Sequence, residues 1–291
     1  MEITLQSLRK TFENQKYICE EDVLVTVYLA IQLGKPLLVE GAPGVGKTEI
    51  AKVLAAAFQT ELIRLQCYEG LDESKALYEW NYQKQLIHIQ AGKSERIQEE
   101  DLFSEEFLLE RPLLKAIRSE QRVVLLIDEV DKTDEAFEAF LFELLSDFQV
   151  SIPEMGTIKA RHIPAVILTS NATRELSDGL KRRCAYLYIG YPSREKELQI
   201  IREKLPQVPL QLAQDIAVGV YYIRKNLELI KPPSIAETLD WAKALLALGA
   251  AGLYEKEVRI TIHFILKNIE DIREFETKIG YAELQRTIHN L

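Results

Sequence analysis

Apolar residues in the first two thirds of the chain form short runs, separated by stretches with helical spacing. This alternation is typical of parallel strands covered by helices on both faces. We therefore predict a doubly wound α/β domain over residues 1–190, built on a five-stranded parallel sheet. Its strands are expected at Pro36–Glu40, Leu62–Cys67, Val123–Ile127, Ala165–Thr169 and Ala185–Ile189.

The pattern beyond residue 190 is helical only. Ser193 is placed to cap a helix with apolar residues on one face, and Ser234 with Glu237 forms a capping-box pattern at the start of another. We therefore predict that residues 191–291 form a small all-helical lid domain.

A phosphate-binding sequence lies between the first predicted strand and a helix predicted over Thr48–Phe58. It reads Gly41-Ala42-Pro43-Gly44-Val45-Gly46-Lys47-Thr48. The glycines allow backbone N–H groups to curl around a polyphosphate, and the following helix directs its positive dipole end at the same anion. Lys47 is expected to reach the β- and γ-phosphates of ATP, and the Thr48 hydroxyl to bind Mg²⁺. A glycine-rich turn without a ligand is the alternative.

Two carboxylates follow the third predicted strand. Asp128 and Glu129 lie at the carboxyl end of this strand, where ligands bind in open α/β sheets. We expect Asp128 to hold Mg²⁺ together with Thr48, and Glu129 to orient and deprotonate the water that attacks the γ-phosphate. The alternative is that both residues, with Asp131, only begin the next helix favourably for its dipole.

Composition narrows the class of protein further. Hydrophobic residues make up 47% of the 291 residues and charged residues 28%, which is ordinary for a soluble protein, and no apolar tract is long enough to span a membrane. A net charge of −9 argues against a nucleic-acid coat, so a protein partner is expected. Cys19, Cys67 and Cys184 are far apart and match no metal-binding pattern. We expect a cytoplasmic protein with reduced thiols and no structural metal.

Four motifs follow one another in a fixed order: the loop Gly41–Thr48, the pair Asp128-Glu129, Thr169-Ser170-Asn171 and the segment Asp178–Cys184. With the helical lid behind it, this set resembles the AAA+ ATPases, and specifically the CoxD-like branch of the MoxR family. The resemblance covers nearly the whole chain. It implies a homo-oligomeric ring, expected to be a hexamer, that hydrolyses ATP to ADP and phosphate with Mg²⁺.

The resemblance also implies roles for two residues. Asn171 occupies the sensor 1 position, whose neutral amide contacts the γ-phosphate or the attacking water; the alternative is an ordinary turn residue at a strand end. Arg183 occupies the position of an arginine finger that acts in trans on a neighbouring subunit. Arg182 is the near alternative and Arg174 a more distant one. For the run Lys181-Arg182-Arg183, the other interpretation is a solvated helix end favoured by the dipole.

One departure from the family pattern concerns the sensor 2 arginine. Ile235 stands about where that arginine is expected, and Lys231 or Arg224 is the candidate substitute. No sensor 2 residue is assigned from the sequence.

Two segments resemble the helix-2 and pre-sensor-1 insertions of the MoxR branch, which face a ring's central pore. The first contains the alternating stretch Leu86–Gly92 ahead of the acidic Glu99–Asp101, with His88 expected at the surface of this arm. The second, Gln149–Ile158, is predicted to be a β-hairpin around a Pro/Gly turn. Surface hairpins without a role are the alternative.

By resemblance to CoxD-like proteins, the ring is expected to remodel or mature a protein client, a metalloenzyme, with a von Willebrand factor A domain protein as adaptor. A nucleic-acid motor or loader is the alternative, since relatives of this branch include helicases, although the acidic charge balance opposes it. A small-molecule kinase ranks last, because the candidate site favours water as the acceptor.

Overall fold

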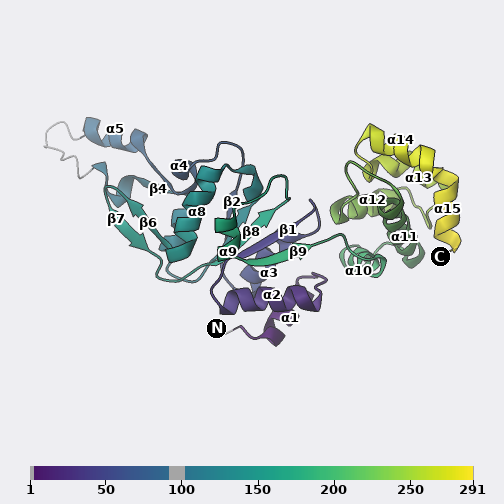
Figure 1. Ribbon diagram of the computed structural model, residues 1–291, viewed down its shortest axis with the longest axis horizontal. Helices are drawn as coiled ribbons and strands as arrows, with labels where there is room; N and C mark the ends of the chain where they lie inside the picture. The colour runs from purple at the N-terminus through teal and green to yellow at the C-terminus, as the bar shows by residue number, and fades with distance from the viewer. Residues whose placement is uncertain (1–2, 92–101, 291) are drawn as a thin grey trace. The chain divides into compact units, whose positions relative to one another are not determined.

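The computed structural model describes residues 3–91 and 102–290 and divides into two compact units (Figure 1). The first unit comprises Met1–Thr11, Glu20–Gly41 and Lys47–Tyr188, and the second comprises Phe12–Cys19, Ala42–Gly46 and Ile189–Leu291. Each unit has a hydrophobic core of its own.

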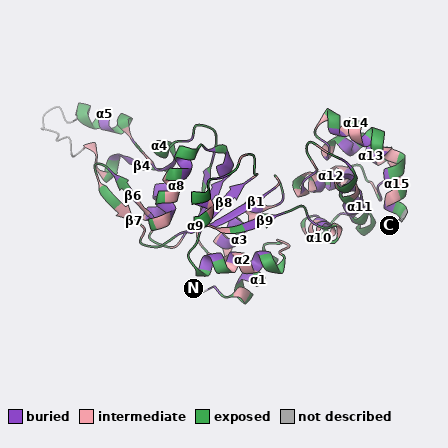
Figure 2. Ribbon diagram, viewed as in Figure 1, coloured by how far each residue is buried: buried purple, intermediate pink, exposed green. Residues whose placement is uncertain are grey.

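The first unit is built on the predicted five-stranded sheet. All five strands occur, each end within one residue of its predicted position: β1 (Leu37–Gly41), β2 (Leu62–Gln66), β5 (Val124–Asp128), β8 (Ala165–Ser170) and β9 (Ala185–Ile189). They lie in the order β2-β5-β8-β1-β9, and the β2–β5, β5–β8 and β8–β1 ladders are parallel. Every residue of β5 and β8 is buried, as expected for central strands covered on both faces, and Figure 2 shows this for β8.

Helices and two 3₁₀ turns connect these strands. The helix predicted after the phosphate loop is α3, which begins one residue early and buries Ile50, Val53 and Leu54. Among the described residues, no helix combines the length and apolarity needed to cross a bilayer. The elements are α1 (Leu5–Asn14), α2 (Glu21–Gln32), α3 (Lys47–Phe58), α4 (Glu73–Ala76), α5 (Tyr82–Ala91), η1 (Glu105–Phe107), α7 (Pro112–Arg118), η2 (Val130–Lys132), α8 (Glu135–Asp147) and α9 (Asp178–Arg183).

Two small antiparallel sheets accompany the main one. The predicted hairpin is confirmed as β6 (Gln149–Ile152) and β7 (Gly156–Lys159), whereas the other insertion differs from the prediction. Its alternating stretch is not an extended arm but part of helix α5, which lies in the sequence between the paired strands β3 (Tyr78–Trp80) and β4 (Leu108–Glu110).

This difference has a local cause. The apolar residues of the stretch are exposed on the helix, so their alternation does not report a buried strand face. His88 is exposed, as predicted, and its ring packs edge-on against Phe107. Gly92 and Glu99–Asp101 lie outside the described residues.

The second unit is helical. Its α10 (Arg194–Lys204) is capped by Ser193, whose side chain accepts from Lys196 N–H, and α12 (Ile235–Ala247) begins with the predicted capping box of Ser234 and Glu237. The fully buried Trp241 donates its indole N–H to Thr261 Oγ1 at 2.7 Å. The other elements are α11 (Leu210–Asn226), α13 (Glu255–Thr261), η3 (Ile262–Phe264), α14 (Ile269–Lys278) and α15 (Gly280–Asn290).

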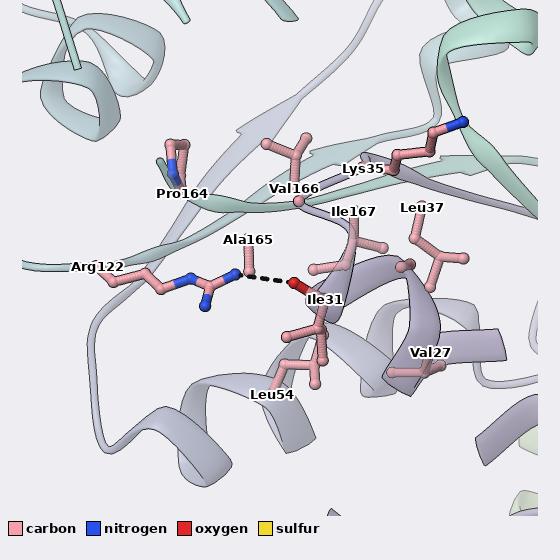
Figure 3. Close-up of a pocket in the computed structure, with 12 residues that line it drawn as sticks. Val27, Ile31, Lys35, Leu37, Leu54, Arg122, Pro164, Ala165, Val166 and Ile167 are labelled. Atoms are coloured by element: carbon pink, nitrogen blue, oxygen red, sulfur yellow. Dashed lines mark hydrogen bonds between the residues drawn. The ribbon is translucent and has the colours of Figure 1, made fainter. Parts of the chain in front are cut away.

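A small cavity lies beside the amino-terminal ends of β1 and β8 (Figure 3). Its volume of about 10 Å³ is enough for one water molecule. Arg122 reaches this cavity and donates to the Ile31 carbonyl oxygen at 3.4 Å, its guanidinium lies 4.7 Å from the Phe58 ring centre, and burial lowers its pKa. The cavity is too small for a substrate. The predicted site residues lie at the opposite edge of the sheet, at the carboxyl ends of the strands.

Candidate active site

The carboxyl ends of three neighbouring strands bring the predicted site residues together. Strand β1 leads into the phosphate loop, β5 ends at Asp128, and β8 ends one residue before Asn171. Gly44 and Gly46 have φ angles of 74° and 97°, a backbone region that residues with a Cβ rarely adopt, so these positions require glycine. The loop backbone therefore depends on glycine at these two positions.

Lys47 links the carboxyl end of β1 to the carboxyl end of β8. Its Nζ donates to the Gly41 carbonyl oxygen at 2.8 Å and to Asn171 Oδ1 at 2.7 Å, and the residue is only 6% exposed. Burial lowers the pKa of Lys47, and the negative charges of Asp131 and Asp128 oppose this shift. The Lys47 ammonium is thus aimed at the Asn171 side chain by contacts within the first unit.

Asp128 is held by hydroxyl groups on one side and by a cation on the other. Its Oδ1 accepts from Thr169 Oγ1 at 2.5 Å and from Thr48 Oγ1 at 3.3 Å. Its Oδ2 accepts from Arg64 Nη2 at 2.5 Å, and the Asp128 side chain is 6% exposed. The predicted pair of Thr48 and Asp128 therefore lies together at this edge of the sheet.

Glu129 has a left-handed backbone, with φ 58° and ψ 49°. Such a conformation is uncommon outside glycine and concentrates at functional sites. Its backbone N–H donates to Thr169 Oγ1 at 2.9 Å, while its carboxylate accepts from Gln66 Nε2 at 3.0 Å and pairs with Lys132 Nζ at 2.5 Å. The hydrogen bond that Lys132 donates to the Glu129 carboxylate raises the pKa of Lys132.

Asp131 shapes the segment that carries Asn171. Its Oδ2 accepts from Asn171 N–H at 3.2 Å and from the Thr173 N–H and hydroxyl at 3.0 and 2.6 Å. Burial alone would raise the pKa of Asp131, but these hydrogen bonds outweigh it and lower the pKa. Asp131 lies in η2, so its role is to hold the neighbouring strand end rather than to open a long helix.

The charges of the site nearly balance. Three carboxylates, from Asp128, Glu129 and Asp131, lie with three cations. The cations are Lys47, which is buried, and Arg64 and Lys132, whose side chains are 53% and 46% exposed. The two exposed cations are the ones that an incoming ligand can displace at least cost.

The three candidate finger arginines differ in their surroundings. Arg183, at the end of α9, is exposed, and its guanidinium lies 4.7 Å from the Phe142 ring centre. Arg182 is exposed, and neither arginine forms an ion pair with a carboxylate of the described residues. Arg174 is engaged by residues of the first unit, because it pairs with Glu138 and donates to the Thr133 carbonyl oxygen at 2.8 Å.

The two candidate sensor 2 substitutes lie in the second unit. Arg224 is buried and forms two hydrogen bonds to the Glu197 carboxylate, at 2.6 and 2.9 Å, and a third to the Pro233 carbonyl oxygen at 2.6 Å. Lys231 is exposed and pairs with Glu237 at 3.6 Å. The contacts of Arg224 are those of a structural residue.

Sequence reasoning missed Arg64 and Gln66, which contact Asp128 and Glu129. A signal was present, because both are polar residues at alternate positions of a strand that was predicted to be buried, and so both face the same side. Gln66 is the register partner of Asp128, which places it at the same edge of the sheet.

Together, the sheet, the phosphate loop and the strand-end carboxylates define a P-loop NTPase. A model of the AAA domain (dynein-related subfamily) matches residues 36–184, about half of the chain, so the protein belongs to this family and is an AAA+ ATP hydrolase. The uncharacterized protein SH1500 of Staphylococcus haemolyticus (strain JCSC1435) is 26% identical over 283 residues, covering 94% of this chain and 98% of that protein.

Solved structures agree with the fold. The Holliday junction branch migration motor RuvB of Thermotoga maritima is 18% identical with a TM-score of 0.51, covering 95% of this chain and 74% of that one. A Cytophaga hutchinsonii protein assigned as an ATPase is 15% identical with a TM-score of 0.50, covering 98% of this chain and 94% of that one. At such identities the likeness concerns the fold alone.

Proposed function

We propose that Glu129 is the general base of ATP hydrolysis, and that Asn171 positions the γ-phosphate or the attacking water. The observation that carries this proposal is the convergence of Lys47, Asp128, Glu129 and Asn171 at three adjacent strand ends, linked by the hydrogen bonds described above. Loop residues Gly41–Thr48 bind the polyphosphate, with backbone N–H groups and the Lys47 ammonium as donors.

The residues present fit Mg²⁺ as a cofactor. Thr48 and Asp128 offer a hydroxyl and a carboxylate oxygen side by side, the hard oxygen ligands that this ion prefers. Asp131 adds a buried Oδ1 that has no hydrogen-bond partner among the described residues. Thr48 and Asp128 would hold the ion, which when bound neutralises charge on the phosphates.

Glu129 is held ready for its role by its neighbours. Gln66 and Lys132 orient the carboxylate, and the left-handed backbone fixes the direction in which the side chain leaves β5. In the reaction, the carboxylate takes a proton from water as the water oxygen attacks the γ-phosphorus and the bond to the ADP oxygen breaks. Lys47 and Asn171 stabilise the charge on the transferred group.

Arg183 is our candidate for the finger that completes a neighbouring subunit's site, with Arg182 as the alternative. Its support is the exposed position of both at the end of α9 and the absence of an acidic partner among the described residues. A guanidinium delivered in trans is worth about 10³ to 10⁵ in rate in other phosphoryl-transfer enzymes. This arrangement requires a ring, for which we propose a homo-hexamer.

The ring would act as a MoxR-type machine of the CoxD-like branch, which remodels or matures a protein client. We propose a metalloenzyme as the client and a von Willebrand factor A domain protein as adaptor. The support is the pair of insertions, one with helix α5 between β3 and β4, the other the β6–β7 hairpin. In this scheme residues 1–190 form the nucleotide-binding domain and 191–291 the lid. Cys19, Cys67 and Cys184 form no disulfide in the described part of the chain, which favours a cytoplasmic location.

A nucleic-acid motor or loader is the second candidate function, favoured by the likeness to RuvB. It predicts that DNA stimulates hydrolysis with a steep salt dependence. The net charge of −9 speaks for the protein client.

The Glu129→Gln variant tests the proposed site. We expect it to bind ATP as the wild type does but to lose turnover by at least about 10²-fold, because the amide cannot accept the proton. Glu143→Gln is the matched control, since Glu143 is exposed on α8 and outside the site. Binding is measured with a fluorescent ATP analogue and turnover by phosphate release. Wild-type turnover in Glu129→Gln would refute the assignment.

A further inference from the structure

A second hollow in the first unit lies away from the strand ends that form the active site. It is a groove of about 1040 Å³ between α4, β3 and the turn end of the β6–β7 hairpin, where Ser151 and Pro153 line it. Its volume is in the upper range of ligand-binding sites. Four aromatic residues line it: Tyr68, Tyr78, Trp80 and Tyr82.

These aromatic side chains offer exposed ring faces and polar groups to a ligand. Tyr68 and Tyr82 are 47% and 61% exposed, an unusual density of exposed rings for one groove. The three phenol groups and the Trp80 indole N–H make no hydrogen bond to other described residues. Tyr78 and Trp80 pack edge-to-face, at 5.9 Å between ring centres, which fixes the floor of the groove.

The charged residues of the groove leave an acidic excess. Asp72 pairs with Lys75 at 3.0 Å, and Glu79 pairs with Arg111, so these four charges cancel. Glu73 also lines the groove, and it has no cationic partner among the residues that the structure describes.

A second carboxylate adds to this excess. Glu154 follows the lining residue Pro153, is exposed, and likewise has no cationic partner in the described part of the chain. Burial raises the pKa of Tyr78, and the charges of Glu154 and Glu73 raise it further, which shows that both carboxylates act on the groove.

We propose that this groove binds an extended, lysine- or arginine-rich segment of a protein. Cationic side chains are attracted both by aromatic faces and by unpaired carboxylates, and their apolar stems pack on rings. Phosphate groups would meet Glu73 and Glu154 with like charge, so nucleic acid does not fit this surface. The inference rests on the proposed function in one respect, because it specifies the chemistry of the client.

The test is a binding titration in the absence of nucleotide, in which the fluorescence anisotropy of a labelled probe is measured as protein is added. The probes are a labelled peptide in which lysine alternates with leucine, the same peptide with glutamate in place of lysine, and labelled oligothymidine. We expect the wild type to bind only the lysine peptide. Glu73→Lys should weaken binding by about tenfold at low salt, and less at high salt. Tyr82→Ala should weaken it by about fivefold.

Two matched variants serve as controls. Glu143→Lys makes the same charge change on α8, and Tyr188→Ala removes a tyrosine that is also 61% exposed; neither residue lines the groove, and both variants should bind the peptide as the wild type does. Equal binding of the glutamate peptide or oligothymidine, no binding of the lysine peptide, or an equal loss in controls and groove variants would each overturn the proposal. Lys47→Ala should keep peptide binding while losing ATP binding, so a failure of the ATPase assignment is seen separately.

Discussion

Arg224 and Glu197 form an ion pair in the second unit whose loss should be costly. The side chains of the two residues are 8% and 1% exposed, and two hydrogen bonds of 2.6 and 2.9 Å join them. Thr238 adds a third hydrogen bond to the Glu197 carboxylate at 2.7 Å. In Arg224→Met the carboxylate stays buried while its counter-charge is removed.

Breaking a buried pair on one side typically costs about 3–5 kcal/mol, because an uncompensated charge remains in a medium of low dielectric. The Arg224 variant also loses a hydrogen bond to the Pro233 carbonyl oxygen and the stacking of the guanidinium 5.0 Å from the Tyr191 ring centre. We therefore expect the free energy of unfolding of the second unit to fall by about 4 kcal/mol. With an m value of about 2 kcal/mol per M, the urea midpoint falls by about 2 M.

The chain offers a clean probe, because it has two tryptophans. Trp241 is fully buried in the core of the second unit, whereas Trp80 belongs to the first. In a Trp80→Phe background, tryptophan fluorescence therefore reports the unfolding of the second unit. Urea titrations of this background with and without Arg224→Met give the difference directly.

The double variant Arg224→Met with Glu197→Leu is the control, since it removes both charges and should recover most of the lost stability. A loss below about 1 kcal/mol in Arg224→Met would refute the reasoning, since it would place the pair in the range of exposed ion pairs.

Three further predictions concern the active site and the thiols. Arg183→Ala should retain ATP binding but lose turnover, and mixing it with Glu129→Gln should restore part of the activity, because each supplies what the other lacks; no recovery in mixed rings would count against a finger in trans. Arg64→Gln should lower the Mg²⁺ concentration for half-maximal hydrolysis by roughly threefold to tenfold, since a positive charge leaves the strand-end aspartate; an unchanged requirement in a Mg²⁺ titration would contradict this. Burial raises the pKa of Cys67 and Cys184 to about 12 from 9.0, so both should resist thiol reagents at pH 8 in the folded protein. Because these pKa values are higher in the folded chain, their contribution to stability is complete below pH 9.0 and is lost as the pH rises toward about 12, which urea titrations across this range would detect.

The sheet could be predicted because its strands are short and mostly apolar, and the central strands β5 and β8 are buried along their whole length. The phosphate loop and the pair Asp128-Glu129 could be predicted because their chemistry requires fixed residue types at fixed spacing. The α5 helix could not, because exposed apolar residues on a helix mimic the alternation of a strand. The sequence also could not distinguish Arg224 from Lys231 as the substitute for the sensor 2 arginine. Only the fold shows that Arg224 is paired with Glu197.

The contacts of Arg64 and Gln66 were hidden for another reason. A strand's composition says which faces are polar, but its register against a neighbour depends on the whole sheet. Here the register places Gln66 opposite Asp128. As a result, Arg64 donates to the Asp128 carboxylate and Gln66 donates to the Glu129 carboxylate.

The position of β2 at the edge of the sheet has a mechanical consequence. Gln66, which holds Glu129, and Tyr68, which lines the aromatic groove, are separated along the chain by Cys67 alone. Since one side of an edge strand has no partner, its end is easier to displace than a central strand. A displacement of Tyr68 in the groove is therefore transmitted through a single residue to Gln66 and so to Glu129, the proposed general base.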